Sequence, residues 1–327
     1  MTDEGPPPRA LRPANATGKR DLLSIVDVAA DLPQILDRAA ELKRGWARGQ
    51  RPRPLADRAV ALSFEKPSTR TRSSFELAVQ QLGGHPVYLA ASEMQLGRGE
   101  TIADTARVLS RYYDALVYRA FLWTNEEELA RWASVPVFNA LDNREHPCQA
   151  ISDLLTLRER WDGRWKGHCL AYIGDGNNVL RSLVLACAVV GLDFAAAIPE
   201  AYRPPAAFFE QARALAAPTG ASLTLVTRPA DAVVDADAVY TDVWVSMGDE
   251  AEAAQRTAAF RGYTVDDALL DRARPGAFAM HDLPAHRGLE ITDSVMDGPR
   301  QVIWDQAENR LHAQKAILER LMVPGTR

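Results

Sequence analysis

The stretch AVALSFEKPSTRTRSSFELAVQQLGG, residues 59–84, places an apolar run, a polar turn and a helical pattern in direct succession. The run 59–64 has the length and composition of a buried strand. A helix is indicated by apolar residues spaced three and four apart, at Phe75, Ala78, Val79 and Leu82, ahead of a glycine pair that ends it. A strand that leads directly into a helix is the repeating unit of a parallel sheet covered by helices.

The same alternation continues on both sides of this stretch. Apolar runs predict further strands at 85–90, 115–119, 135–141, 168–176, 193–199, 222–227, 237–244, 276–283 and 300–306. Helical spacing predicts helices from Asp31 onward and at 101–113, 125–133, 150–161, 178–191, 208–216 and 308–322. We therefore expect an α/β protein with two doubly wound parallel-sheet domains, an interdomain active-site cleft, and a C-terminal helix that closes the chain.

The expected domain boundaries follow from this pattern and from composition. Residues 1–20 are rich in Pro and Ala and predict a flexible tail. Residues 21–150 form the first domain, to which the C-terminal helix region 308–327 returns. Residues 151–307 form the second domain.

Composition limits the possible function classes. The 327 residues are 47% hydrophobic and 25% charged, as in ordinary soluble proteins, and the net charge of −5 creates no basic field for nucleic acid or an anionic membrane. The longest apolar run, 183–192, is far shorter than the roughly 20 residues of a membrane helix. Three cysteines without CxxC spacing and the absence of a signal-peptide pattern predict a cytoplasmic protein.

The turn Ser68-Thr69-Arg70-Thr71-Arg72 lies where the strand gives way to the helix. Backbone N–H groups at a helix N-terminus favour anions, and the arginine side chain fits phosphate oxygens in a bidentate manner. An ordinary helix cap would need only Ser68. The additional hydroxyls and arginines therefore predict a phosphate or other oxyanion site.

Two more motifs follow strands. His146-Pro147-Cys148-Gln149 offers an imidazole and an amide that could polarise a carbonyl, although a histidine in a loop is often structural. Gly174-Asp175-Gly176-Asn177-Asn178 resembles a nucleotide-binding turn but does not satisfy GxGxxG. It could instead hold a small carboxylate at a helix N-terminus, with Asn178 as a ligand.

Acidic residues lie at the ends of two predicted strands of the second half, 237–244 and 276–283. In DVWVSMG (242–248) the carboxylate of Asp242 and the hydroxyl of Ser246 could bind an ammonium group. In HDLPAHRG (281–288) Asp282 is expected to point into the cleft, and the alternative is an acidic residue that only stabilises a turn. Arg310 near the start of the last helix offers another guanidinium for an anion.

Taken together and in this order, the motifs resemble those of the aspartate/ornithine carbamoyltransferase family, and most closely those of its ornithine branch. The resemblance extends from about residue 21 to about residue 322. It implies a carbamoyl phosphate-binding first domain and an amino-acid-binding second domain. It also implies transfer of a carbamoyl group to the side-chain amine of an amino acid, most simply ornithine to give citrulline and phosphate.

Site residues follow from the resemblance, position by position. It assigns the carbamoyl phosphate site to Ser68, Thr69, Arg70, Thr71, Arg119, His146, Gln149, Leu283 and Arg310. It assigns the amino-acid site to Asn178, Asp242, Ser246 and Met247, and catalysis to Arg70, Arg119, His146 and Asp282. It implies homotrimers in which a neighbour's loop, here QLGRGE (95–100), completes each site. No metal and no organic cofactor are expected.

One position departs from the family pattern. Ornithine carbamoyltransferases have Cys where this chain has Asp282. A carboxylate beside an ammonium raises the pKa of the amine and opposes formation of the neutral nucleophile, but it could also accept the proton. Three hypotheses therefore stay open: transfer to ornithine, transfer to another diamino acid such as lysine, diaminobutyrate or diaminopropionate, and a catalytically silent paralogue with a regulatory role.

Overall fold

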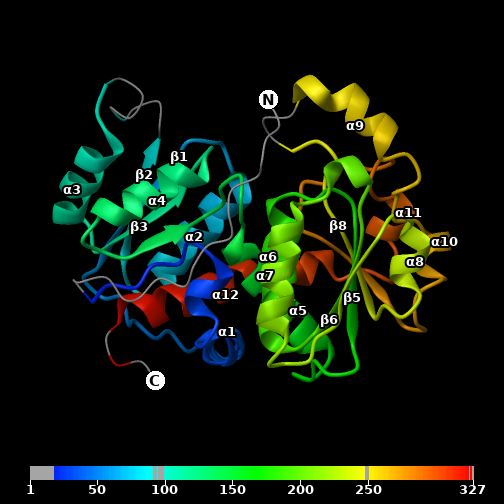
Figure 1. Ribbon diagram of the computed structural model, residues 1–327. Coiled ribbons are helices and arrows are strands. Elements are labelled where there is room, and N and C mark those ends of the chain that lie inside the picture. The colour runs from blue at the N-terminus through cyan, green and yellow to red at the C-terminus, as the bar shows by residue number, and fades with distance from the viewer. Residues whose placement is uncertain (1–17, 91–93, 95–98, 247–249, 324, 326–327) are drawn as a thin grey trace. The chain divides into compact units, whose positions relative to one another are not determined.

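The structure is a computed structural model that describes residues 18–90, 94, 99–246, 250–323 and 325. The chain divides into two compact units. The first unit contains the described residues up to Leu155 and those from Glu308 onward, and the second unit contains Thr156–Ala307. Each unit is an α/β structure built on one parallel sheet (Figure 1).

The first unit has a sheet of four parallel strands in the order β2-β1-β3-β4. Its strands are β1 (Ala59–Phe64), β2 (His85–Ala90), β3 (Ala115–Arg119) and β4 (Val137–Asn139). Its helices are η1 (Ile25–Val28), α1 (Leu32–Ala47), α2 (Thr69–Gln81), α3 (Ile102–Tyr112), α4 (Trp123–Trp132), most of α5 (Pro147–Arg160) and most of α12 (Ile303–Met322). Buried residues of α3 and α4 pack with strand residues such as Leu116 and Tyr118 in one core cluster.

The second unit has a sheet of five parallel strands in the order β7-β6-β5-β8-β9. Its strands are β5 (Cys169–Ile173), β6 (Asp193–Ala197), β7 (Leu223–Val226), β8 (Ala238–Thr241) and β9 (Phe278–His281). Its helices are α6 (Asn178–Val190), η2 (Glu200–Tyr202), α7 (Ala206–Ala216), α8 (Pro229–Val233), η3 (Glu250–Glu252), α9 (Ala253–Ala259), α10 (Asp267–Leu270) and α11 (Asp293–Met296). One core cluster joins the aromatic side chains Trp244, Phe260 and Tyr263 to strand residues of this sheet.

Side-chain caps fix the starts of the two helices that follow the sequence motifs. Ser68 is extended, and its hydroxyl accepts a hydrogen bond from the Thr71 backbone N–H at 3.3 Å at the start of α2. Asn177 caps α6 by accepting from two backbone N–H groups. Because parallel strands end at the same edge of a sheet, each of these helix N-termini lies at the edge where its unit's other motifs begin.

The predicted α/β class and the parallel sheets are confirmed, and the strands at 59–64, 85–90 and 115–119 have the predicted bounds. The predicted strand at 300–306 is wrong. Gln301 forms a single parallel bridge with Ala279, and helix α12 begins at Ile303. The short apolar run QVIW is compatible with either structure, and the Gln301 side chain accepts from the Ile303 N–H and so starts a helix.

The expected tail, residues 1–20, lies outside the described residues except for its last three. Lys19 is buried and donates to the Ala130 carbonyl at 2.7 Å, and Arg20 pairs with Asp31. These two side chains tie the start of the described chain to α1 and α4.

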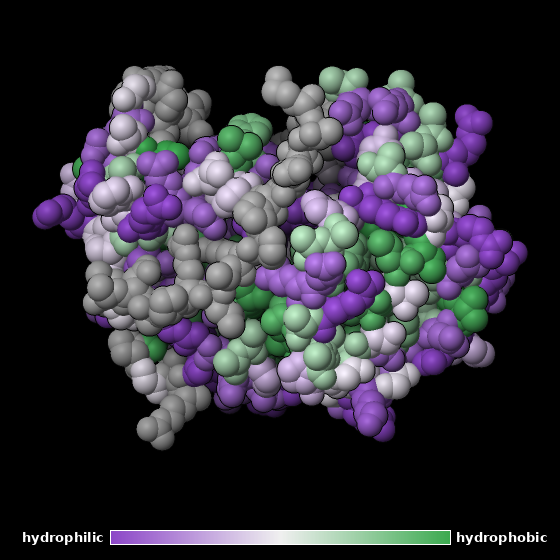
Figure 2. All heavy atoms as spheres, viewed as in Figure 1, coloured by the Kyte–Doolittle hydropathy of each residue, from purple (hydrophilic) through white to green (hydrophobic). Residues whose placement is uncertain are grey.

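Hydrophilic residues are spread over the visible face of both units (Figure 2). Among the described helices, none combines the length and the apolar character required to cross a membrane.

Gly176 provides a stability test of the second unit. A Cβ at this position would lie 2.1 Å from the Tyr202 carbonyl oxygen and 2.6 Å from Pro204 Cδ. A backbone oxygen cannot rotate away as a flexible side chain does, so we expect Gly176→Ala to lower the free energy of unfolding by about 3 kcal/mol. Urea denaturation would measure this.

Gly220→Ala is the control, because its Cβ would meet nothing within 4 Å and adds only the cost of a left-handed backbone, about 1 kcal/mol. A Gly176→Ala protein as stable as the wild type would contradict the close approach of the 176 turn to Tyr202.

Candidate active site

Thr71 is the centre of a buried polar network in the first unit. Arg310 donates to the Thr71 hydroxyl at 2.7 Å and to Gln149 Oε1 at 2.6 Å. Arg119, at the end of β3, donates to the same hydroxyl at 3.4 Å. All four residues are at least nine-tenths buried. Four separate elements, α2, β3, α5 and α12, therefore place their side chains at one point.

His146 lies at the start of α5, and its carbonyl accepts from the N–H groups of Gln149 and Ala150. Its imidazole is 2% exposed. Burial and then the positive charges of Arg310 and Arg119 lower the pKa of His146 well below its ordinary value of 6.5. The imidazole is therefore neutral at physiological pH and can donate a single hydrogen bond while the guanidinium groups supply the charge.

The first unit thus has the components of an anion site. The first turn of α2 contains Thr69, which is exposed, and Arg70, which is half-buried. Backbone N–H groups and the helix dipole favour an anion at this end of α2. Buried guanidinium and amide groups add donors that suit the oxygens of a phosphate or a carbonyl.

Two supporting carboxylates were not predicted from the sequence. Asp153 accepts from Gln149 Nε2 at 2.8 Å and so fixes the orientation of the amide. Asp153 lies four residues after Gln149 on the same helix, and this spacing, which brings two side chains together, could have indicated the contact from the sequence. Glu65 accepts from the Tyr118 hydroxyl and from the Phe121 N–H, on either side of Arg119. Burial and the Glu65 charge raise the pKa of Tyr118.

In the second unit Asp242 follows β8 and is 5% exposed. Its carboxylate accepts from Asn177 Nδ2 at 2.7 Å and from the Val243 N–H at 2.7 Å. Asn177 therefore connects this carboxylate to the N-terminus of α6, where Asn178 is the first helical residue. Asn178 was predicted from the sequence and Asn177 was not, although the place of Asn177 before the first helical residue in the DGNN turn is typical of a helix cap.

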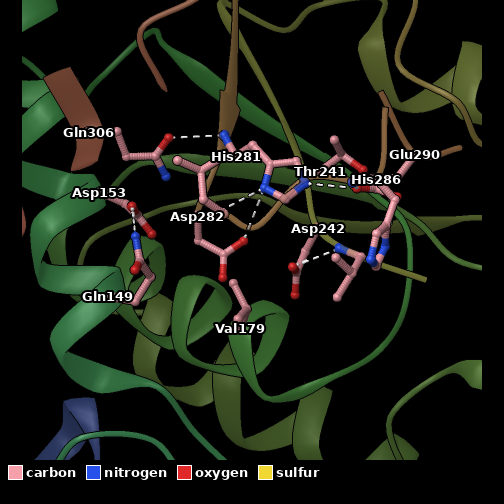
Figure 3. A network of polar contacts seen from close by, with 12 residues as sticks. Gln149, Asp153, Val179, Thr241, Asp242, His281, Asp282, His286, Glu290 and Gln306 are labelled. Carbon is pink, nitrogen blue, oxygen red and sulfur yellow. Dashed lines mark hydrogen bonds and ion pairs between the residues drawn. The ribbon is translucent and has the colours of Figure 1, made fainter. Parts of the chain in front are cut away.

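Asp282 follows the adjacent strand β9 and lies beside a fixed histidine (Figure 3). His281 is fully buried; its Nδ1 accepts from the Leu283 N–H at 2.8 Å, and its Nε2 lies 3.2 Å from Glu290 Oε1. Because Nδ1 accepts a hydrogen bond, the ring proton is on Nε2, and this N–H points toward Glu290. The 3.5 Å approach of Asp282 to Nδ1 is therefore not an ion pair.

The carboxylates of Asp242 and Asp282 form one acidic group. One oxygen from each and a ring nitrogen of His281 all lie within 4.8 Å of one another, and Figure 3 shows both carboxylates on the same side of the ring. This spacing is compatible with a metal ion, but the Nδ1 lone pair already accepts the Leu283 N–H. Two carboxylates beside a neutral ring instead favour an ammonium group.

The predicted site residues thus fall into two sets. The first unit contains Ser68, Thr69, Arg70, Thr71, Arg119, His146, Gln149 and Arg310. The second unit contains Asn178, Asp242, Ser246, Asp282 and Leu283. Met247 and residues 95–98 of the predicted neighbour loop lie outside the described residues. The assignment of Leu283 to the phosphate site stays a prediction.

Known proteins resemble the chain along most of its length. The family model for the carbamoyl-P binding domain of aspartate/ornithine carbamoyltransferase matches residues 20–159, and the model for the Asp/Orn binding domain matches residues 166–321. The ornithine carbamoyltransferase of Methanoculleus marisnigri is 52% identical over 308 residues, which cover 94% of this chain and 98% of that protein. The catabolic ornithine carbamoyltransferase of Thermoplasma acidophilum is 48% identical over 93% of this chain and 99% of its own length.

A solved structure is equally similar. The ornithine carbamoyltransferase from Pyrococcus furiosus superimposes with a TM-score of 0.90 at 49% identity, covering 94% of this chain and 98% of its own. The two family models together match most of the chain, and the relatives and the solved structure are similar to it over more than nine-tenths of its length, so the chain belongs to the aspartate/ornithine carbamoyltransferase family.

Proposed function

We propose that this protein transfers the carbamoyl group of carbamoyl phosphate to the side-chain amine of L-ornithine, producing L-citrulline and phosphate. The observation that carries the proposal is the buried network of Arg310, Arg119, Gln149 and Thr71 at the N-terminus of α2, in a chain of this family. The ornithine carbamoyltransferases that resemble it support ornithine as the acceptor.

The proposed chemistry needs groups that stabilise negative charge. The amine nitrogen attacks the carbamoyl carbon, the carbonyl oxygen becomes negative, and the bond to the phosphate oxygen breaks so that phosphate leaves. Arg70 and Arg119 would bind the phosphate oxygens, and Arg310 and neutral His146 would donate to the carbonyl oxygen. Catalysis then consists of positioning and preorganised electrostatics, without a covalent enzyme intermediate.

The second unit would hold the amino acid. Asp242 and Ser246 would bind its α-ammonium group, and Asn178 at the N-terminus of α6 would bind its α-carboxylate. The burial of Asp242 supports this role, because a buried carboxylate is costly without a cationic partner. Asp282 would then lie beside the side-chain amine and stabilise its ammonium form, and the leaving phosphate would take the proton that the attacking amine loses.

The Asp242–Asp282 group also favours a second candidate, a carbamoyltransferase for another diamino acid. A carboxylate in place of a thiol changes the charge beside the attacking amine and so can change which amine reacts. The silent paralogue is supported less, because a protein without catalysis has no need of buried guanidinium groups around Thr71.

Both a catabolic and an anabolic ornithine carbamoyltransferase are similar to this chain, at 48% and 49% identity, so the relatives favour neither the catabolic nor the anabolic direction. We also propose a cytoplasmic homotrimer that needs no cofactor, as the family resemblance implies.

Arg310→Met tests the phosphate site. Loss of a buried, charged hydrogen-bond donor costs about 1.5–3 kcal/mol, so we expect the Kd for carbamoyl phosphate to rise roughly 10- to 150-fold in calorimetric titrations. Arg320→Met is the control, because Arg320 lies ten residues further along the same helix, roughly 15 Å away, and pairs with the part-buried Asp31 rather than with Thr71. Equal effects of the two substitutions would remove Arg310 from the site.

Replacement of Asp282 tests the acceptor. Phosphate release is measured with ornithine, lysine, 2,4-diaminobutyrate, 2,3-diaminopropionate, putrescine and aspartate. We expect the wild type to prefer ornithine. Asp282→Cys should raise kcat/KM for ornithine by roughly tenfold at neutral pH, because removing one carboxylate lowers the pKa of the bound amine by about one unit.

Asp282→Asn serves as the control that removes charge without adding a thiol. If the wild type prefers another diamine and Asp282→Cys loses that activity without gaining any on ornithine, Asp282 specifies a different substrate and the ornithine proposal is wrong.

A further inference from the structure

Glu145 directly precedes His146 in the loop that leads from β4 to α5. It is 4% exposed, and its carboxylate accepts from the Ile25 N–H at 3.2 Å and from the Ser24 hydroxyl. These partners are separated from it by about 120 residues of chain. One carboxylate therefore connects the His146 loop to the start of η1.

The partner segment is itself fixed to the sheet. The Leu22 N–H donates to the Val137 carbonyl at 2.9 Å, and the Asn139 N–H donates to the Leu22 carbonyl at 2.8 Å. Leu22 thus extends the sheet beyond β4 by a parallel bridge to Phe138. The contact from Glu145 reaches a rigid support rather than a free strand end.

The loop between Asn139 and His146 depends on buried polar contacts. Asp142 accepts from the N–H groups of Arg144 and Glu145 at 2.7 Å each, and from Asn139 Nδ2 at 3.0 Å. Leu141 has a φ of 135°, which is unfavourable for a residue with a side chain. The surrounding hydrogen bonds therefore hold this loop in a conformation that it would not otherwise adopt.

Acidic groups face Glu145 from both elements that pack against it. Asp142 lies in its own loop, and Asp27 lies in η1, where it accepts from the N–H groups of Leu23 and Ser24. Burial, followed by the charges of Asp142 and Asp27, raises the pKa of Glu145 to about 7, against the lowering effect of its two hydrogen bonds. Glu145 therefore changes its charge in the physiological pH range.

We propose that Glu145 is a positioning residue for His146, which holds the His146 loop to η1 through its hydrogen bonds with Ile25 and Ser24, and that ionisation of this carboxyl group loosens the loop and weakens carbamoyl phosphate binding. Ionised Glu145 adds a third negative charge beside Asp142 and Asp27, and the three charges repel one another. This repulsion opposes the contact between the Glu145 carboxylate and η1. The inference rests on the proposed function, since the ligand that reports on His146 is carbamoyl phosphate.

Glu145→Gln keeps the shape and an acceptor oxygen for Ile25 but cannot ionise. We expect the wild-type Kd for carbamoyl phosphate, measured without an acceptor, to rise several-fold between pH 6 and pH 8.5, and the Kd of Glu145→Gln to stay nearly constant. Asp21→Asn is the control: Asp21 lies in the same segment and its pKa is also raised by burial, but it pairs with Lys19 and accepts from the Val137 N–H rather than contacting the His146 loop. Its pH profile should follow the wild type.

Hydrogen exchange provides a readout that needs no ligand. Corrected for the intrinsic effect of pH, exchange of residues 139–150 should increase above pH 7 in the wild type and not in Glu145→Gln. Identical exchange and identical pH profiles in the two proteins would overturn the inference. If the wild type binds no carbamoyl phosphate at any pH, the proposed function fails, and the exchange comparison still decides the role of Glu145.

Stability gives a further check with a defined sign. A carboxyl group whose pKa rises on folding from 4.5 to about 7 contributes stability at low pH and loses it as the pH rises through this window. The Tm of Glu145→Gln should therefore exceed that of the wild type at pH 8.5, with the difference shrinking toward pH 5. A constant difference would show that Glu145 does not titrate there.

Discussion

The hydroxyl of Thr71 receives hydrogen bonds from two buried guanidinium groups, and this concentration of positive charge determines the character of the first unit's site. Burying a charged arginine side chain costs free energy, so each of the two guanidinium groups depends on helices or strands that are held in place by their own packing. Strand β3 ends at Arg119, and helix α12 places Arg310 against α2 and α5. Burial and then the same charges keep His146 neutral by lowering its pKa. An anion with several oxygens fits such a site.

The second unit has the opposite polarity. The carboxylates of Asp242 and Asp282 lie beside an imidazole whose two nitrogens are already bonded to Leu283 and Glu290. Nothing in that ring neutralises the carboxylates. A site of this kind would suit an ammonium group, as the first would suit an anion, and the proposed carbamoyl transfer needs one substrate of each kind.

Much of this could be predicted from the sequence, because apolar runs and helical spacing have short-range causes. The strand before the STRTR turn and the helix after it have their predicted bounds to within about one residue. Contacts between segments that lie far apart in the sequence produce no such local pattern of residues. Glu145 bonding to Ile25, Glu65 beside Arg119, and Asn177 beside Asp242 depend on tertiary packing. The strand predicted at 300–306 failed for a local reason, since a short apolar run is ambiguous and a glutamine side chain started a helix there.

The protonation state of His146 tests the central claim most directly. The chain has six histidines, and the His146 signal can be assigned in an ¹⁵N NMR spectrum by comparison with His146→Gln. If burial and the two arginines set the potential at this site, the His146 imidazole should remain neutral from pH 8 to pH 5. A titration midpoint near the ordinary value of 6.5 would show that the site lacks this positive potential and would contradict the account.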